Sequence, residues 1–220
     1  MKKLIVTLVC VSMVLGSASA LTVGGRDLGD FEIGLSTGFP LEWLKGESRG
    51  KGMTVSSELK PIHHGSEALT SVPFVMSFGS NFGWSKKLSN SNFAIGADLQ
   101  SDILAGANKE QLILGGRFKL APVFKYYFTE KFNIALLPGI ILGLEEIDSK
   151  TAPQMVFYFP FGLGVGVKAQ TYFTKTFGMN LGVDVDFMLK GVIEEQVKII
   201  PNATAKLISV TPKLGFVFKF

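Results

Sequence analysis

The stretch Phe161-Gly162-Leu163-Gly164-Val165-Gly166-Val167-Lys168 places an apolar side chain at every second position, with a glycine or a charge between them. A period of two is that of a β-strand, in which successive side chains point to opposite faces. One face of this strand is therefore apolar, and the other carries small or charged residues. The alternation continues outward over residues 154–173 and recurs along the rest of the chain.

Eight segments show this alternation, and the apolar face of each contains no charged residue. They span residues 30–40, 71–84, 92–104, 111–128, 132–145, 154–173, 177–190 and 206–220. The charges gather on the opposite face. This segregation is typical of a wall that faces lipid, where one Arg or Lys near the midplane costs about 2–4 kcal/mol.

A soluble lipocalin-like barrel would place the apolar face inside, and the glycines disfavour that arrangement. Gly34, Gly79, Gly96 and Gly164 are among many that share the charged face, whereas Gly116 falls on the apolar one. The interior of a barrel of about eight strands is just wide enough for side chains, so small residues belong inside. The fold class is therefore all-β, a transmembrane antiparallel up-and-down barrel of eight strands. Ten strands stay an alternative because residues 53–60 also alternate.

Residues 1–20 have the pattern of a cleavable secretory signal. Lys2 and Lys3 precede an apolar run that is too short to span a bilayer, and Ala18 and Ala20 supply the small residues before the cleavage point. Residues 21–220 then form the barrel. Cleavage would remove Cys10, the single cysteine, so the mature chain is expected to contain no disulfide.

Composition excludes several function classes. No run of 18 apolar residues follows the signal, so a helical membrane protein is excluded. Loss of Lys2 and Lys3 lowers the formal net charge from +4 to +2, and no basic tract with interleaved aromatics suggests nucleic acid as a partner. No residue pattern indicates a cofactor or a metal, and the chain is not expected to be an enzyme.

The connections between the predicted strands set the orientation. Short connections at 85–91, 129–131 and 174–176 alternate with longer or more polar ones, of which the extended segment near 41–70 is the first. Bacterial barrels have short periplasmic turns and longer outer loops, so both termini are expected on the periplasmic side. The final strand ends on Phe216, Phe218 and Phe220, the pattern expected of a signal for the barrel-insertion machinery.

Charged residues on the inward face form a candidate network in the lumen. Its predicted members are Glu32, Asp98, Arg117, Lys119, Lys125, Lys168, Asp184, Asp186 and Lys213. One interpretation is a polar path for a solute. The other is a self-neutralising plug, since buried charges persist when they are paired and hydrogen-bonded.

Five prolines lie within or beside the predicted strands: Pro73, Pro122, Pro138, Pro160 and Pro212. Proline cannot donate to a strand ladder, and a closed barrel has no edge on which to place it. Bulges or local loss of pairing are therefore expected at these positions.

One pair of residues suggests chemistry. His63 and His64 lie in the first outer segment, close to Ser66 and Glu67. Nucleophilic catalysis needs a serine, a histidine and a carboxylate that converge in space, and proximity in sequence does not supply this. A lipid-modifying enzyme is the least favoured of three hypotheses for function.

The signal, the eight alternating strands, the terminal Phe220 and the stretch 159–166 make the chain resemble the small outer-membrane β-barrel superfamily of OmpA, OmpX and OmpW. The strand prolines are most similar to the OmpW branch. That resemblance implies a protein in contact with outer-membrane lipid that admits small hydrophobic molecules and releases them sideways through a wall gap at the prolines. The alternative is a non-conducting structural or surface-interaction barrel with a charge-plugged lumen and the 41–70 segment as its contact surface.

Overall fold

The computed structural model describes residues 22–23, 26–27, 29–48, 60–61, 74–107, 111–149, 155–194 and 198–220. Every regular element within these ranges is a β-strand. No helix in them is long and apolar enough to span a membrane. The two-residue period thus predicted the class of secondary structure correctly.

Three short pieces accompany nine longer strands. The short pieces are β1 (Thr22–Val23), β2 (Arg26–Asp27) and β5 (Lys60–Pro61). The longer strands are β3 (Asp30–Gly38), β4 (Leu41–Ser48), β6 (Phe74–Lys87), β7 (Phe93–Ala107), β8 (Gln111–Tyr127), β9 (Phe132–Ser149), β10 (Met155–Tyr172), β11 (Phe177–Glu194) and β12 (Lys198–Lys219).

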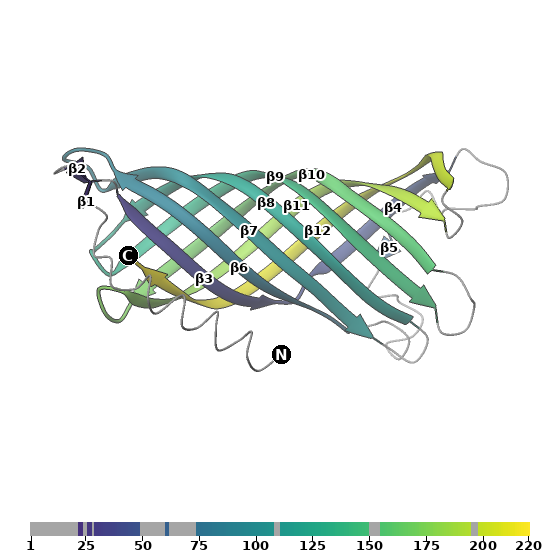
Figure 1. Cartoon of the computed structure of the whole chain (residues 1–220), viewed down its shortest axis with the longest axis horizontal. Helices are drawn as coiled ribbons and strands as arrows, with labels where there is room; N and C mark the ends of the chain where they lie inside the picture. Colours follow the sequence, from purple (N-terminus) through teal and green to yellow (C-terminus); the bar gives the residue numbers. More distant parts are fainter. Residues whose placement is uncertain are drawn as a thin grey trace.

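The longer strands close into a barrel, as Figure 1 shows. From β6 to β12, each strand pairs antiparallel with the next. β12 then pairs with β3 over residues 213–219 and with β4 over residues 203–210, and β3 pairs with β6. Because only Phe39 and Pro40 separate β3 from β4, these two act as one wall strand. The result is a closed antiparallel barrel of eight wall strands, which confirms the predicted fold class.

The first wall strand runs further than the sequence predicted. The segment near 41–70 was expected to be a connection, but β4 continues the wall from Leu41 to Ser48. The register against β12 is the same before and after Phe39 and Pro40, whereas the pairing with β6 stops at Gly38 opposite Ser77. Beyond this point the described partner of β4 on that side is β5, through Trp43 and Leu44.

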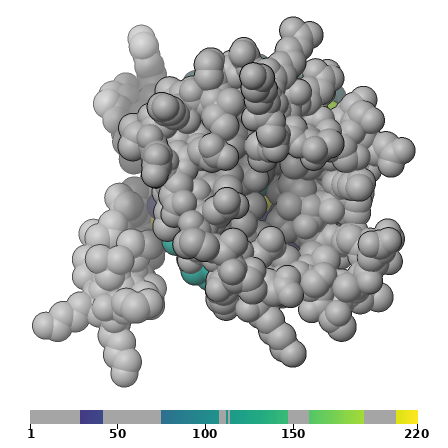
Figure 2. All heavy atoms as spheres, turned by 90° about the vertical axis from the view of Figure 1, so that its right-hand side faces the viewer, coloured from purple at the N-terminus to yellow at the C-terminus, as the bar shows by residue number. Residues whose placement is uncertain are grey.

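The two ends of the barrel differ. At one end, which we call the turn end, residues 88–92, 128–131 and 173–176 join consecutive strands. β3 begins at this end and β12 finishes there, where Phe31 and Phe220 exchange two backbone hydrogen bonds of 3.2 and 2.8 Å. At the other end, the loop end, the chain passes through the ranges that are not described. Viewed from the loop end, only small coloured areas belong to described residues (Figure 2).

The outer face of the wall is apolar and exposed. Leu163 is 66% exposed, Leu181 61% and Phe161 50%, and many other Phe, Leu, Ile and Val side chains share this environment. A soluble monomer rarely exposes a continuous apolar patch above a few hundred Å². Lipid removes that cost, and closure pairs the backbone of the wall from strand to strand, as the hydrocarbon region requires, except between β4 and β6. This exterior is therefore that of a membrane-spanning barrel.

Prolines interrupt the ladder in the predicted manner. Between β8 and β9 the pairing stops after Leu120 and resumes at Phe124, and Pro122 would face Pro138 within this gap. Between β9 and β10 no partners are assigned at residues 159–160, where Pro160 is fully buried. Near Pro212, β12 changes partner from β3 to β4. Pro73 lies outside the described residues.

Candidate functional site: ion-pair layers inside the barrel

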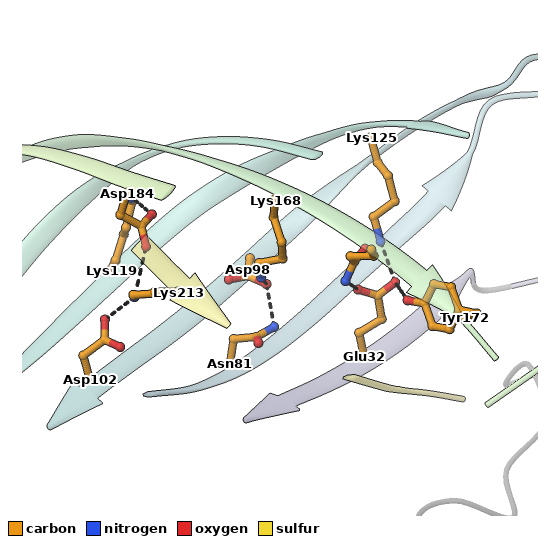
Figure 3. Close-up of polar contacts among 11 residues, drawn as sticks. Glu32, Asn81, Asp98, Asp102, Lys119, Lys125, Lys168, Tyr172, Asp184 and Lys213 are labelled. Atoms are coloured by element: carbon orange, nitrogen blue, oxygen red, sulfur yellow. Dashed lines mark hydrogen bonds and ion pairs between the residues drawn. The ribbon is translucent and has the colours of Figure 1, made fainter. Parts of the chain in front are cut away.

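The inward face of the wall carries charged side chains that meet across the lumen (Figure 3). Nearest the turn end, β3 supplies Glu32 and β8 supplies Lys125, whose Nζ lies 2.5 Å from Glu32 Oε1. Gln170 Nε2 of β10 donates to Glu32 Oε2 at 3.0 Å, and the Tyr172 hydroxyl donates to Oε1 at 2.8 Å. Both carboxylate oxygens of Glu32 are thus satisfied, which a buried charge requires.

A second group covers this layer at the turn end. Lys219 Nζ lies 3.3 Å from Asp30 Oδ2, and the Tyr127 hydroxyl donates to the same oxygen at 3.3 Å. The ammonium of Lys87 sits 4.3 Å from the centre of the Tyr127 ring, within the range of a cation–π contact. First and last wall strands are therefore joined by side chains as well as by backbone.

The middle layer is less tightly bonded. Asn81 Nδ2 of β6 donates to Asp98 Oδ2 of β7 at 3.0 Å. Lys168 of β10 is the cation of this layer, and its Nζ lies 3.7 Å from Asp98 Oδ2. That distance is an ion pair but exceeds the range of a direct hydrogen bond.

Towards the loop end, two lysines hold three aspartates. Lys213 Nζ lies 2.6 Å from Asp102 Oδ2 and 3.0 Å from Asp184 Oδ2. Lys119 Nζ lies 2.7 Å from Asp184 Oδ1 and 3.4 Å from Asp186 Oδ1. Asp184 accepts from both lysines, so it bridges β8 and β12 through the centre of the lumen.

Arg117 and Glu145 form the last described layer. Arg117 Nη2 and Nε lie 2.5 and 2.7 Å from Glu145 Oε1, and Nη1 donates to Ser209 Oγ at 3.3 Å. Both charged residues are at most 5% exposed. Arginine suits this position because its planar fork presents several donors at once.

A glycine faces each of six acids of these layers across a strand pair, whereas Asp30 at the turn end faces Ser85. The opposed pairs are Glu32 and Asp98 with Gly83, Asp102 with Gly79, Glu145 with Gly115, Asp184 with Gly166, and Asp186 with Gly164. A Cβ at Gly79, Gly164 or Gly166 would overlap a carboxylate oxygen of the facing aspartate. The glycines therefore create the room in which the carboxylates lie.

The structure places all nine sequence-predicted charges on the inner face, and each has a described partner of opposite charge. Sequence reasoning also put Asp102, Glu145 and Lys219 on the charged inward face but did not name them as members of this network, although the structure pairs them with Lys213, Arg117 and Asp30. It also missed the neutral partners Asn81, Gln170 and Tyr172, because amides and tyrosines on an inward face give no charge signal.

Other predicted sites have different outcomes. His63 and His64 lie outside the described residues, as do Ala18 and Ala20. Phe216 is exposed on the lipid face, and its ring stacks 5.8 Å from that of Phe177. The role of the terminal phenylalanines in assembly stays a prediction. In the described part of the chain, no group of three His, Cys, Asp or Glu side chains could hold a metal ion.

No family model matches the chain, and no curated protein matches it either. Solved structures that resemble it include OprG from Pseudomonas aeruginosa, with 13% identity over 87% of this chain and 96% of that chain and a TM-score of 0.49. Neisserial surface protein A has 13% identity over 87% and 99%, with a TM-score of 0.48. AlkL in lipid bilayers has 13% identity over 93% and 96%, with a TM-score of 0.49. The structure of this chain is itself a closed barrel of eight antiparallel wall strands.

Proposed function

We propose that the protein is an integral outer-membrane barrel whose lumen is closed to ions and polar solutes by its ion-pair layers. The observation that carries this proposal is the series of contacts across the lumen, from Asp30–Lys219 at the turn end to Arg117–Glu145. To pass along the axis, a solute would have to break several buried ion pairs in succession. Breaking one such pair by removing a partner costs about 3–5 kcal/mol.

Permeability of proteoliposomes tests this proposal. Purified protein in liposomes should give no sugar-driven swelling and no ion conductance above empty liposomes. A variant with Asp30, Glu32, Asp98, Asp102, Glu145, Asp184, Asp186 and their lysine and arginine partners replaced by alanine is the positive control once an unheated gel shows that it folds, because it removes every described layer while the wall stays apolar outside. Conductance or swelling of wild-type proteoliposomes above that of empty liposomes would contradict the proposal.

The proposed orientation places the turn end in the periplasm. Short turns at this end and long connections at the other are the supporting observation. The exposed turn residue Ser89, replaced by cysteine, should react with an impermeant thiol reagent only after the outer membrane is disrupted. The proposed loss of Cys10 with the signal would leave this cysteine as the single thiol. Labelling in intact cells would reverse the orientation.

A second candidate function is sideways admission of small apolar molecules from the loop end. The break at Phe39 and Pro40 favours it, because pairing between the first wall strand and β6 stops there. Val75 of β6 and Leu104 of β7 form a buried apolar cluster on the inner face near this break. An apolar solute would therefore find apolar side chains on the inner side of an incompletely paired wall.

Uptake of a small apolar fluorophore into proteoliposomes tests the second candidate. Replacing Leu104 with glutamine should lower the uptake rate, since a polar side chain then lines the route. Replacement of the exposed Leu88 at the turn end by glutamine is the matched control and should leave the rate unchanged. Equal rates in wild type, both variants and empty liposomes would eliminate this function.

The surface-interaction function stays a prediction. It rests on the 41–70 segment, of which the structure describes residues 41–48 and 60–61. Binding to the insertion machinery and the absence of enzyme activity also stay predictions.

A further inference from the structure

The middle of the lumen differs from the layers on either side of it. Lys125 and Lys213 each lie 2.6 Å or less from a carboxylate oxygen, whereas Lys168 lies 3.7 Å from Asp98. Figure 3 shows Lys168 and Asp98 between the two tighter groups. A polar separation above 3.5 Å leaves open whether a water molecule lies between the two groups, which the surroundings of the pair decide.

Two buried acceptors beside this pair have no protein partner among the described residues. They are Asp98 Oδ1 and Gln170 Oε1, on side chains that are 3% and 1% exposed. Buried polar atoms are nearly always hydrogen-bonded, to protein or to ordered water. Both atoms therefore point to a hydrogen-bond donor that the protein does not supply.

Lys168 also lines two small cavities that meet at its side chain. The cavity on the turn-end side is bounded by Glu32, Asp98, Lys125 and Gln170, and its apolar wall is formed by Val123, Ala135 and Leu137. The cavity on the loop-end side is bounded by Asn81, Asp102, Asp184 and Lys213. Each leaves about 10–20 Å³ for the centre of a water molecule, which is room for one.

We propose that a buried water molecule bridges the Lys168 ammonium to the Asp98 carboxylate and donates to Gln170 Oε1. The ligand must be neutral, because a cation would meet Lys168 and Lys125, and an anion would meet Asp98 and Glu32. It must also both donate and accept, since Lys168 offers protons while Asp98 and Gln170 offer oxygens. Water meets these conditions at the available size and makes the usual three hydrogen bonds.

This site connects the two ion-pair layers through water in place of a direct side-chain contact. Lys168 then contacts its carboxylate partner Asp98 through water. Lys119, Lys125 and Lys213 bond directly to their carboxylate partners. The bridging water lies inside the ion-pair layers, and its presence does not depend on whether the barrel admits apolar solutes sideways.

Magnetisation transfer from water to methyl groups tests the site in methyl-labelled protein in lipid nanodiscs. The methyls of Val123, Ala135 and Leu137 line the cavity and should show transfer from water. Ala121 and Val217 are equally buried and line neither cavity, so their methyls should show none. Absence of transfer at the methyls of all five residues, or equal transfer at all five residues, would overturn the proposal.

The variant Lys168→Arg tests the bridge itself. A guanidinium is longer than an ammonium and presents five donors, so it should reach Asp98 directly and displace the water. Transfer at Val123 and Ala135, which line only the turn-end cavity of the two, should fall to the Ala121 level, and the folded fraction on an unheated gel should stay unchanged. Undiminished transfer in a folded Lys168→Arg protein would place the water elsewhere and overturn the bridge.

Discussion

Asp186 lies directly opposite Gly164 in the register of β11 and β10, and its carboxylate occupies the space that a Cβ at position 164 would fill. Gly166 and Asp184 repeat the arrangement two residues along. The alternating glycines of β10 therefore have a specific structural effect. It leaves room for acids that the neighbouring strand directs into the lumen.

Gly164→Ala should therefore destabilise the folded barrel. The added methyl would meet Asp186 Oδ1 and, at 2.7 Å, Ile141 Cδ1, and overpacking of this kind costs about 1–3 kcal/mol. Gly116→Ala is the matched control, because the nearest atom to its Cβ is the Asp102 backbone oxygen at 3.8 Å. Urea unfolding in lipid vesicles measures both. Equal free energies of unfolding for the two variants would contradict this account.

The pair of Lys125 and Glu32 should show strong coupling. Lys125→Met leaves the Glu32 carboxylate buried without its cation, and we expect a loss of about 3–5 kcal/mol. Glu32→Gln alone leaves the lysine unpaired and should cost a similar amount. The double variant should cost less than the sum of the two, as measured by a double-mutant cycle of unfolding free energies. Additive costs would show that the pair contributes nothing specific.

The cost of placing a charge on the outer face should depend on how deep the position lies in the bilayer. Leu163 lies at the centre of β10 and is 66% exposed, so Leu163→Arg should cost about 2–4 kcal/mol in a bilayer. Phe173 follows the end of β10 at the turn end, where the same change should cost about 0–1 kcal/mol. Folding equilibria in vesicles give both values. A larger cost at Phe173 than at Leu163 would contradict the placement of Leu163 near the bilayer centre and of Phe173 near its boundary.

Asn90 is the described non-glycine residue with a left-handed backbone, with φ of 56°, in the turn between β6 and β7. Asn90→Ala should destabilise the barrel by about 1 kcal/mol, because a Cβ without a local hydrogen-bonding group disfavours this conformation. Asn90→Gly should be neutral or slightly stabilising. The urea concentration at the midpoint of unfolding should be highest with glycine at position 90, lower with asparagine and lowest with alanine. A midpoint for alanine at or above that of asparagine would refute the explanation.

The sequence predicted the strands of the wall better than the continuation of the first strand as β4. Period-two alternation located the strands, and the separation of charge from large apolar residues predicted which face meets lipid. Both properties belong to single strands and can be read locally. The continuation of the first strand as β4 was missed, because Phe39-Pro40 resembles a strand end and the pairing of β4 depends on residues of β12 that lie 155 to 169 positions along the chain.

The partners within the lumen were decided by the tertiary structure alone. Lys125 and Glu32 are 93 residues apart in the chain, and Lys119 and Asp184 are 65 apart. Their meeting depends on how the strands tilt and on the register in which the sheet closes, which sets the height of each side chain along the axis. By itself the sequence determined that these charges point inward, since alternation is a property of one strand. Closure decided which of them meet, because contact across a lumen involves strands that are not neighbours.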